Sequence, residues 1–98
     1  MPTFVQEITD ARVCEGEKVV FEAIYSGTPT PDIVWYLNDK LLRNTKNIKI
    51  QYKENKTSCT IFSATSEEVG TYVCKATSDI GLAVTKAKLY VQGKNTAF

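Results

Sequence analysis

The fold is decided by residues 68–74, which read Glu-Val-Gly-Thr-Tyr-Val-Cys. Successive side chains of a β-strand point to opposite faces, so Tyr72 and Cys74 share one face and Val73 lies on the other. Gly70 marks the turn that precedes this strand. The stretch therefore predicts a half-buried strand that begins at a turn and directs its tyrosine and cysteine inward.

The same alternation recurs along the chain, whereas no segment has the periodicity of an amphipathic helix. Val19, Phe21 and Ala23 share one face, with Lys18 and Glu22 on the other. Near the end of the chain, Ala87 and Leu89 alternate with lysines. Prolines, glycines and short polar runs separate these segments. The predicted strands are residues 3–9, 11–14, 17–26, 32–38, 41–43, 47–53, 57–64, 71–79 and 82–92. Short strands at this spacing are typical of an all-β sandwich.

The length of 98 residues suits one small domain and is too short for two. We expect residues 1–93 to form that domain and residues 94–98 to be a tail or the start of a linker. The formal net charge of +1 disfavours nucleic-acid binding, which requires a basic surplus. No run of about 18 apolar residues exists and no apolar leader follows Met1, so we expect neither a membrane span nor a signal peptide. We expect the isolated domain to be monomeric.

Residue types that carry catalysis or metal binding do not cluster in this sequence. Histidine, the commonest general base and metal ligand, is absent. The inward phase of Cys59 and Cys74 favours buried, inert thiols, and Cys14 stands apart from them. No two cysteines have metal-ligand spacing, and the acidic residues 67–68 are expected in a solvated turn. We therefore predict no catalytic, cofactor-binding or metal-binding residue, and no cofactor.

Three features in a fixed order resemble the immunoglobulin fold. Trp35 lies on a predicted strand twelve residues after Ala23, and Tyr72 precedes Cys74 by two residues, as in the tyrosine corner of that fold. The loop at residues 27–31 and the stretch 76–81 resemble the intermediate, or I, set of the family. Within this set, the chain is most similar to the intracellular domains of titin and its relatives twitchin, obscurin, myosin-binding protein C and palladin.

This resemblance implies an immunoglobulin-like β-sandwich of two antiparallel sheets with Greek-key connections. Extracellular members place a cysteine where this chain has Ala23, so Cys74 lacks a partner and we expect no disulfide between the sheets. Such a bridge would close a loop of about 52 residues and contribute roughly 4 kcal/mol. A secreted domain would rarely lack this bridge, whereas a domain in the cytosol must lack it because thiols stay reduced there. Glu68 replaces the usual aspartate, which weakens a salt bridge expected there.

Without that bridge, packing around the single tryptophan must hold the domain together. We assign the structural core to Ala23, Trp35, Tyr72, Cys74 and Leu89. The other side chains that share the inward phase, and that we expect beside them, are Val19, Phe21, Ile33, Ile50, Cys59, Ile61 and Ala87.

The resemblance implies a structural and protein-interaction module of a large modular muscle or cytoskeletal protein, without enzyme activity of its own. A titin-type parent would carry any kinase as a separate domain. The implied partners are neighbouring immunoglobulin or fibronectin-type domains in tandem, and other sarcomeric or cytoskeletal proteins, in the cytoplasm of the sarcomere. Neither nucleic acid nor membrane is an expected partner.

In such a fold, mechanical tension would pass through the strands predicted at residues 11–14 and 82–92, which lie parallel and adjacent in one sheet. Their hydrogen bonds would then be loaded together in shear. We expect this mechanical clamp to consist of Arg12, Val13 and Cys14 facing Lys86, Ala87, Lys88 and Leu89.

Two alternatives remain open. The motif Asn55-Lys56-Thr57 fits an N-glycosylation site and favours an extracellular adhesion or receptor domain. Partner recognition would instead use a sheet edge or a sheet face with exposed apolar residues such as Tyr36, Phe62 or Tyr90. The basic residues between 46 and 56 form a solvated face or a docking site for an acidic partner.

The assignment of Trp35 to the core is testable by Trp35→Ala. We expect the free energy of unfolding, measured by denaturant titration, to fall by about 3–5 kcal/mol, because the change removes the largest core side chain. A loss below about 1 kcal/mol would show that the strand at residues 32–38 is misplaced.

Overall fold

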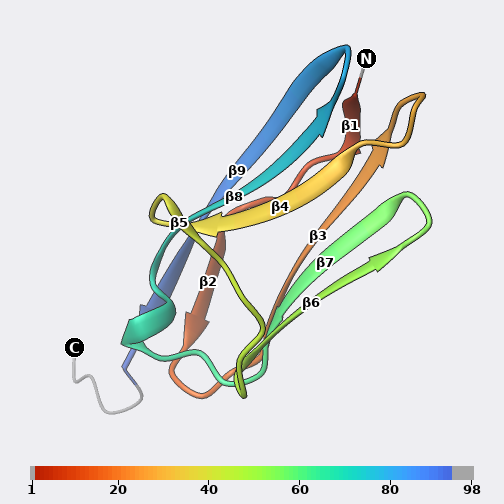
Figure 1. Cartoon of the computed structure of the whole chain (residues 1–98). Helices are drawn as coiled ribbons and strands as arrows, with labels where there is room; N and C mark the ends of the chain where they lie inside the picture. Colours follow the sequence, from red (N-terminus) through yellow and green to blue (C-terminus); the bar gives the residue numbers. More distant parts are fainter. Residues whose placement is uncertain (1, 94–98) are drawn as a thin grey trace.

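Two β-sheets face each other in the computed structural model, which describes residues 2–93 of the chain (Figure 1). The four-stranded sheet has the order β1-β3-β7-β6, and the five-stranded sheet has the order β2-β9-β8-β4-β5. The all-β sandwich predicted above is confirmed. The residues expected to be a tail, 94–98, lie outside the described part of the chain.

The four-stranded sheet is antiparallel throughout. Its strands are β1 (Thr3–Gln6), β3 (Val19–Ser26), β7 (Lys56–Ile61) and β6 (Ile48–Lys53). In β3 every second residue from Val19 to Tyr25 is buried, as the sequence alternation predicts. The sheet thus presents one apolar face to the interior and one polar face to solvent.

The five-stranded sheet is antiparallel except at one edge, where β2 and β9 run parallel. Its strands are β2 (Ala11–Cys14), β9 (Gly81–Gln92), β8 (Gly70–Ser78), β4 (Asp32–Leu37) and β5 (Lys40–Leu41). The chain crosses between the sheets after β1, β2, β3, β5 and β7, as in a Greek key. The start of β1 and the end of β9 lie at opposite ends of the molecule, whose long axis is 50 Å (Figure 1).

Several strand ends differ from the predicted ones for local reasons. The strand predicted at 41–43 is Lys40–Leu41, because Asn38 and Asp39 both have positive φ and form a two-residue turn directly before it. The strand predicted at 57–64 ends at Ile61. The backbone N–H groups of the next two residues donate to the backbone carbonyl and the side-chain Oδ1 of Asn47. Residues 66–68 form a short 3-10 turn, the only helical segment within residues 2–93.

The free edge of β6 is covered by the segment that precedes it. The backbone N–H of Ile50 donates to Asn44 Oδ1 at 2.8 Å, and the backbone N–H of Ile48 donates to Thr45 Oγ1 at 3.0 Å. Edge strands otherwise expose unpaired backbone groups on which another strand can pair. Side chains from residues 44–45 therefore close part of this edge within the domain itself.

Gly70 opens β8 at a position that only glycine fits. Its φ is +149°, and a Cβ at this residue would lie within 2.3 Å of Asn38 Oδ1. The same Asn38 oxygen accepts the backbone N–H of Thr71 at 2.9 Å. The side-chain amide of Asn38 thus joins the β4–β5 turn to the start of β8 in the space that a side chain at residue 70 would occupy.

We predict that Gly70→Ala lowers the free energy of unfolding by about 1–3 kcal/mol, from backbone strain and displacement of the Asn38 amide. In a double-mutant cycle with Asn38→Gly, which removes the obstructing side chain, the alanine should cost less. Gly81→Ala is the control, because Gly81 is not among the residues with positive φ. An equal cost in the two backgrounds would show that the contact with Asn38 is not the cause.

Candidate functional site

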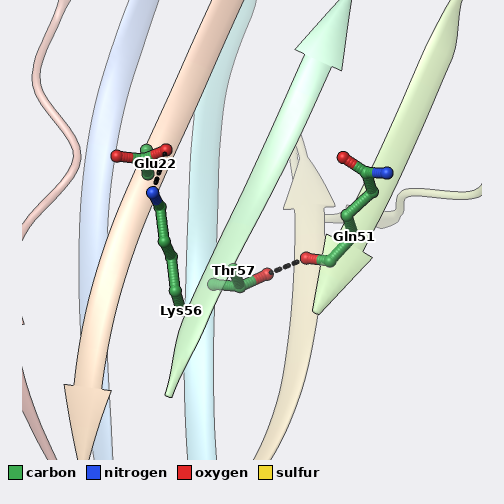
Figure 2. Close-up of polar contacts among 4 residues, drawn as sticks. All are labelled: Glu22, Gln51, Lys56 and Thr57. Carbon is green, nitrogen blue, oxygen red and sulfur yellow. Dashed lines mark hydrogen bonds and ion pairs between the residues drawn. The ribbon is translucent and has the colours of Figure 1, made fainter. Parts of the chain in front are cut away.

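A buried chain of hydrogen bonds links the two sheets at the tryptophan. The indole Nε1–H of Trp35 on β4 donates to Thr57 Oγ1 on β7 at 2.9 Å. The Thr57 hydroxyl in turn donates to the backbone carbonyl of Gln51 on β6 at 3.0 Å, as Figure 2 shows. Trp35 and Thr57 are each only 1% exposed, so both polar groups satisfy in the interior the bonds they lose with water.

The neighbouring residue on β7 points to the opposite side of the sheet. Lys56 Nζ lies 3.1 Å from Glu22 Oε2 on β3, on the outer face (Figure 2). Both side chains are substantially exposed, and ion pairs in water contribute about 0–1 kcal/mol. The larger contribution to stability is therefore expected from Thr57, whose side chain faces inward and links the two sheets.

A second buried hydrogen bond fixes the start of β8. The Tyr72 hydroxyl donates to the backbone carbonyl of Glu68 at 2.6 Å, and its ring packs 4.9 Å from the Phe21 ring between centroids. This is the geometry of the tyrosine corner. The expectation that residues 67–68 lie in a solvated turn is wrong for Glu68, which is 8% exposed. Its carboxylate accepts the backbone N–H and the hydroxyl of Thr65 and so caps the 3-10 turn.

The core contains two thiols and no disulfide. Cys59 on β7 and Cys74 on β8 are both fully buried and free, whereas Cys14 is exposed. Burial raises the pKa of Cys59 to about 12 and that of Cys74 to about 12, with the nearby Cys59 adding to the second shift. Since the thiolate is the reactive form, both side chains behave at neutral pH as small apolar groups.

All five residues assigned to the structural core lie between the sheets. Ala23, Trp35, Tyr72, Cys74 and Leu89 are each at most 1% exposed. Two residues expected beside them, at positions 33 and 50, are only half-buried and pack against the core from its margin. The buried residues that the predicted core did not include are Pro2, Ile8, Tyr25, Pro31, Ile48, Thr57, Ala64, Glu68, Ala76 and Thr85.

Two of the omitted residues are threonines whose strand phase could have identified them. Thr57 has the same phase as Cys59, and Thr85 has the same phase as Ala87. The Thr85 hydroxyl accepts the backbone N–H of Ile8 at 3.3 Å, which is a further link between distant parts of the chain. Their polarity concealed them, although threonine is a common strand residue and its hydroxyl can be satisfied internally.

The parallel edge pair β2–β9 is present, but with a different register from the predicted one. Arg12, Val13 and Cys14 lie opposite Tyr90, Val91 and Gln92, so the prediction that they face residues 86–89 is wrong. Of the predicted β9 partners, only Leu89 is paired with β2, opposite Ala11. A shift of four residues, from Lys86 to Tyr90 opposite Arg12, keeps every inward side chain inward, so alternation cannot distinguish these registers.

Side chains and turns extend this pair at both ends. Before β2, Asp10 Oδ1 accepts the backbone N–H of Lys88 at 2.7 Å. After β2, the backbone N–H of Glu15 donates to the Gln92 carbonyl at 2.7 Å. The Arg12 guanidinium also lies 4.4 Å from the centre of the Tyr90 ring, in a cation–π contact across the two strands. Lys86 and Ala87 have no partner on β2.

The part of the chain that the structure describes contains no candidate metal site. Residues 2–93 contain no group of three acidic, cysteine or histidine side chains placed to hold a metal ion. Among the same residues, no helix has the length and apolarity needed to cross a membrane. Asn55 of the glycosylation motif is exposed in the turn between β6 and β7.

Residues 2–91 match the family model described as immunoglobulin I-set domain. The chain belongs to the immunoglobulin I-set family. An I-set domain is a non-catalytic module, in agreement with the expectation that this domain is not an enzyme.

Similar I-set domains occur in large muscle proteins. Titin of Drosophila melanogaster is 34% identical over 95 residues, which are 97% of this chain and 0% of titin to the nearest per cent. Myopalladin of Mus musculus is 34% identical over 96 residues, or 98% of this chain and 7% of myopalladin. The chain therefore spans only a small part of these relatives.

Solved structures of titin domains have the same fold. The titin domains Z1Z2 in complex with telethonin match with a TM-score of 0.90 and 30% identity, over 95% of this chain and 48% of theirs. The titin M3 domain matches with a TM-score of 0.88 and 29% identity, over 93% of this chain and 96% of its own.

The link between Trp35 and Thr57 generates a prediction about stability. Thr57→Val keeps the side-chain shape but leaves the indole N–H without an acceptor, so the free energy of unfolding should fall by about 1–3 kcal/mol. Thr60→Val is the matched control, since Thr60 lies on the outer face of the same strand, and should change the value by less than about 0.5 kcal/mol. Exchange of the indole proton with deuterated solvent should accelerate only in the first variant. Equal effects of the two changes on stability would contradict the role given to Thr57.

Proposed function

We propose that this chain is one structural and protein-interaction module of a larger titin-like muscle protein. It would contribute mechanical spacing, elasticity and scaffold binding in the sarcomere or cytoskeleton, joined in tandem to other immunoglobulin or fibronectin-type domains. The similarity to domains of titin and myopalladin supports this assignment. It favours the muscle module over the extracellular alternative, which rests on the motif at Asn55.

The observation that carries the mechanical part of the proposal is the position of the two ends of the domain. β1 begins at one pole and β9 ends at the other (Figure 1), so modules of this kind can be joined end to end. About 90 residues extended at about 3.4 Å each reach roughly 300 Å. The folded long axis is 50 Å, so one unfolding event would release several times the length of the domain.

The parallel pair β2–β9 provides the resistance in this proposal. Tension applied at the two poles pulls these neighbouring strands in opposite directions along their lengths, so their hydrogen bonds must break together. The contacts of Asp10 with Lys88 and of Glu15 with Gln92 would extend the sheared region beyond the four paired residues of β2. The mechanical clamp is therefore proposed as residues 10–15 against residues 88–92.

Single-molecule pulling tests this clamp. Asp10→Ala removes the acceptor of the Lys88 N–H, and Glu15→Pro removes the donor to the Gln92 carbonyl. We expect both variants to unfold at lower force than the wild-type domain, with equilibrium costs of about 1–3 kcal/mol. Asp79→Ala, in the exposed β8–β9 turn, is the control and should leave the force unchanged. An unfolding force unaffected by either clamp variant would contradict the proposal.

A further inference from the structure

The outer face of the five-stranded sheet carries apolar side chains interspersed with lysines. Cross-strand pairing places Leu41, Tyr36 and Val73 in one row, which ends at Lys86 on β9. The adjacent row runs from Val34 through Lys75 to Val84. Neighbours in such rows are close enough for their side chains to touch. Val84 is 41% exposed and Leu82, further along β9, is 51% exposed, so apolar groups on this face meet solvent.

Within residues 2–93, neither lysine in these rows has an ion-pair partner. Among residues 2–93 the only ion pair is Lys56 with Glu22, on the other sheet. A shallow hollow is lined by Tyr36, Val73 and Val84, by both lysines of the rows, and by Asp39 at its margin. Two ammonium groups therefore flank an apolar depression, with one aspartate at its border.

The outer face of the four-stranded sheet is different. Its three corresponding rows are mostly polar and pair no two apolar residues: Val20–Thr60–Lys49, Glu22–Ser58–Gln51 and Ile24–Lys56–Lys53. The face that combines adjacent apolar residues with unpaired cations is thus the one formed by β4, β8 and β9. We call it the β4–β8–β9 face.

We propose that the β4–β8–β9 face binds an acidic protein segment carrying an exposed aromatic or aliphatic anchor residue. The anchor would enter the hollow between Tyr36, Val73 and Val84, where burial of apolar surface supplies affinity. Carboxylates beside it would pair with Lys75 and Lys86, which sets orientation and makes binding sensitive to salt. The inference rests on the interaction part of the proposed function and specifies its surface and partner chemistry.

The test uses a synthetic twelve-residue peptide of glutamates and leucines with a central phenylalanine, titrated into the isotopically labelled domain at low salt. We expect saturable shifts of backbone resonances confined to β4, β8 and β9. The double variant Lys75→Glu, Lys86→Glu should weaken binding at least tenfold, and Val84→Ser should weaken it several-fold. The control double variant Lys49→Glu, Lys53→Glu, on the other sheet, has the same charge change and should stay within twofold of wild type.

Two further peptides separate the components of recognition. A version with lysine in place of glutamate should not bind, and a version with serine in place of the apolar residues should bind at least tenfold more weakly. Shifts on the four-stranded sheet, an equal loss in the control variant, or no saturable binding up to millimolar peptide would overturn the inference. The mechanical proposal is tested separately by single-molecule pulling. A domain that resists force but does not bind the acidic peptide would support the mechanical proposal and contradict the inference about the β4–β8–β9 face.

Discussion

The hydrogen bond from Trp35 to Thr57 is the constraint on which the sandwich depends. It crosses from β4 in one sheet to β7 in the other, and Thr57 passes the connection on to β6. A buried hydrogen bond is directional in a way that apolar contact is not, and an unpaired indole N–H in this position would be costly. In a domain with no covalent link between its sheets, this contact fixes how the two layers are placed against each other.

Apolar packing then supplies most of the stability around that point. The Phe21 and Tyr72 rings contact each other, and the small side chains at Ala23 and Cys74 are fully buried. Because Ala23 cannot form a disulfide with Cys74, close packing takes the place of a covalent link between the sheets. The tyrosine corner adds a second directional contact at the entrance to β8, where Gly70 and Asn38 fit together.

The strands and much of the core could be predicted from sequence because alternation records directly which face of each strand is buried. The order of Trp35, Tyr72 and Cys74 indicated the immunoglobulin fold, and the stretches 27–31 and 76–81 indicated the I set. The register of β2 on β9 could not be predicted, because a shift by an even number of residues preserves alternation. The contacts that fix it, such as Asp10 with Lys88 and Glu15 with Gln92, form only in the folded domain. Thr57 and Glu68 were missed for a different reason: each is polar and buried. The hydrogen-bond partners of Thr57 lie on other strands, whereas the carboxylate of Glu68 bonds Thr65, three residues earlier, in a local capping box.

The covered edge of β6 would have a consequence in the tandem arrangement proposed above. Tethered neighbours meet at effective concentrations in the millimolar range, where any open strand is a template for pairing with the next domain. Asn44 and Thr45 already occupy backbone donors of β6 from within the same domain. When such a domain unfolds and refolds beside similar domains, its own chain would occupy these donors of β6. This favours refolding into separate domains over strand pairing between neighbouring domains.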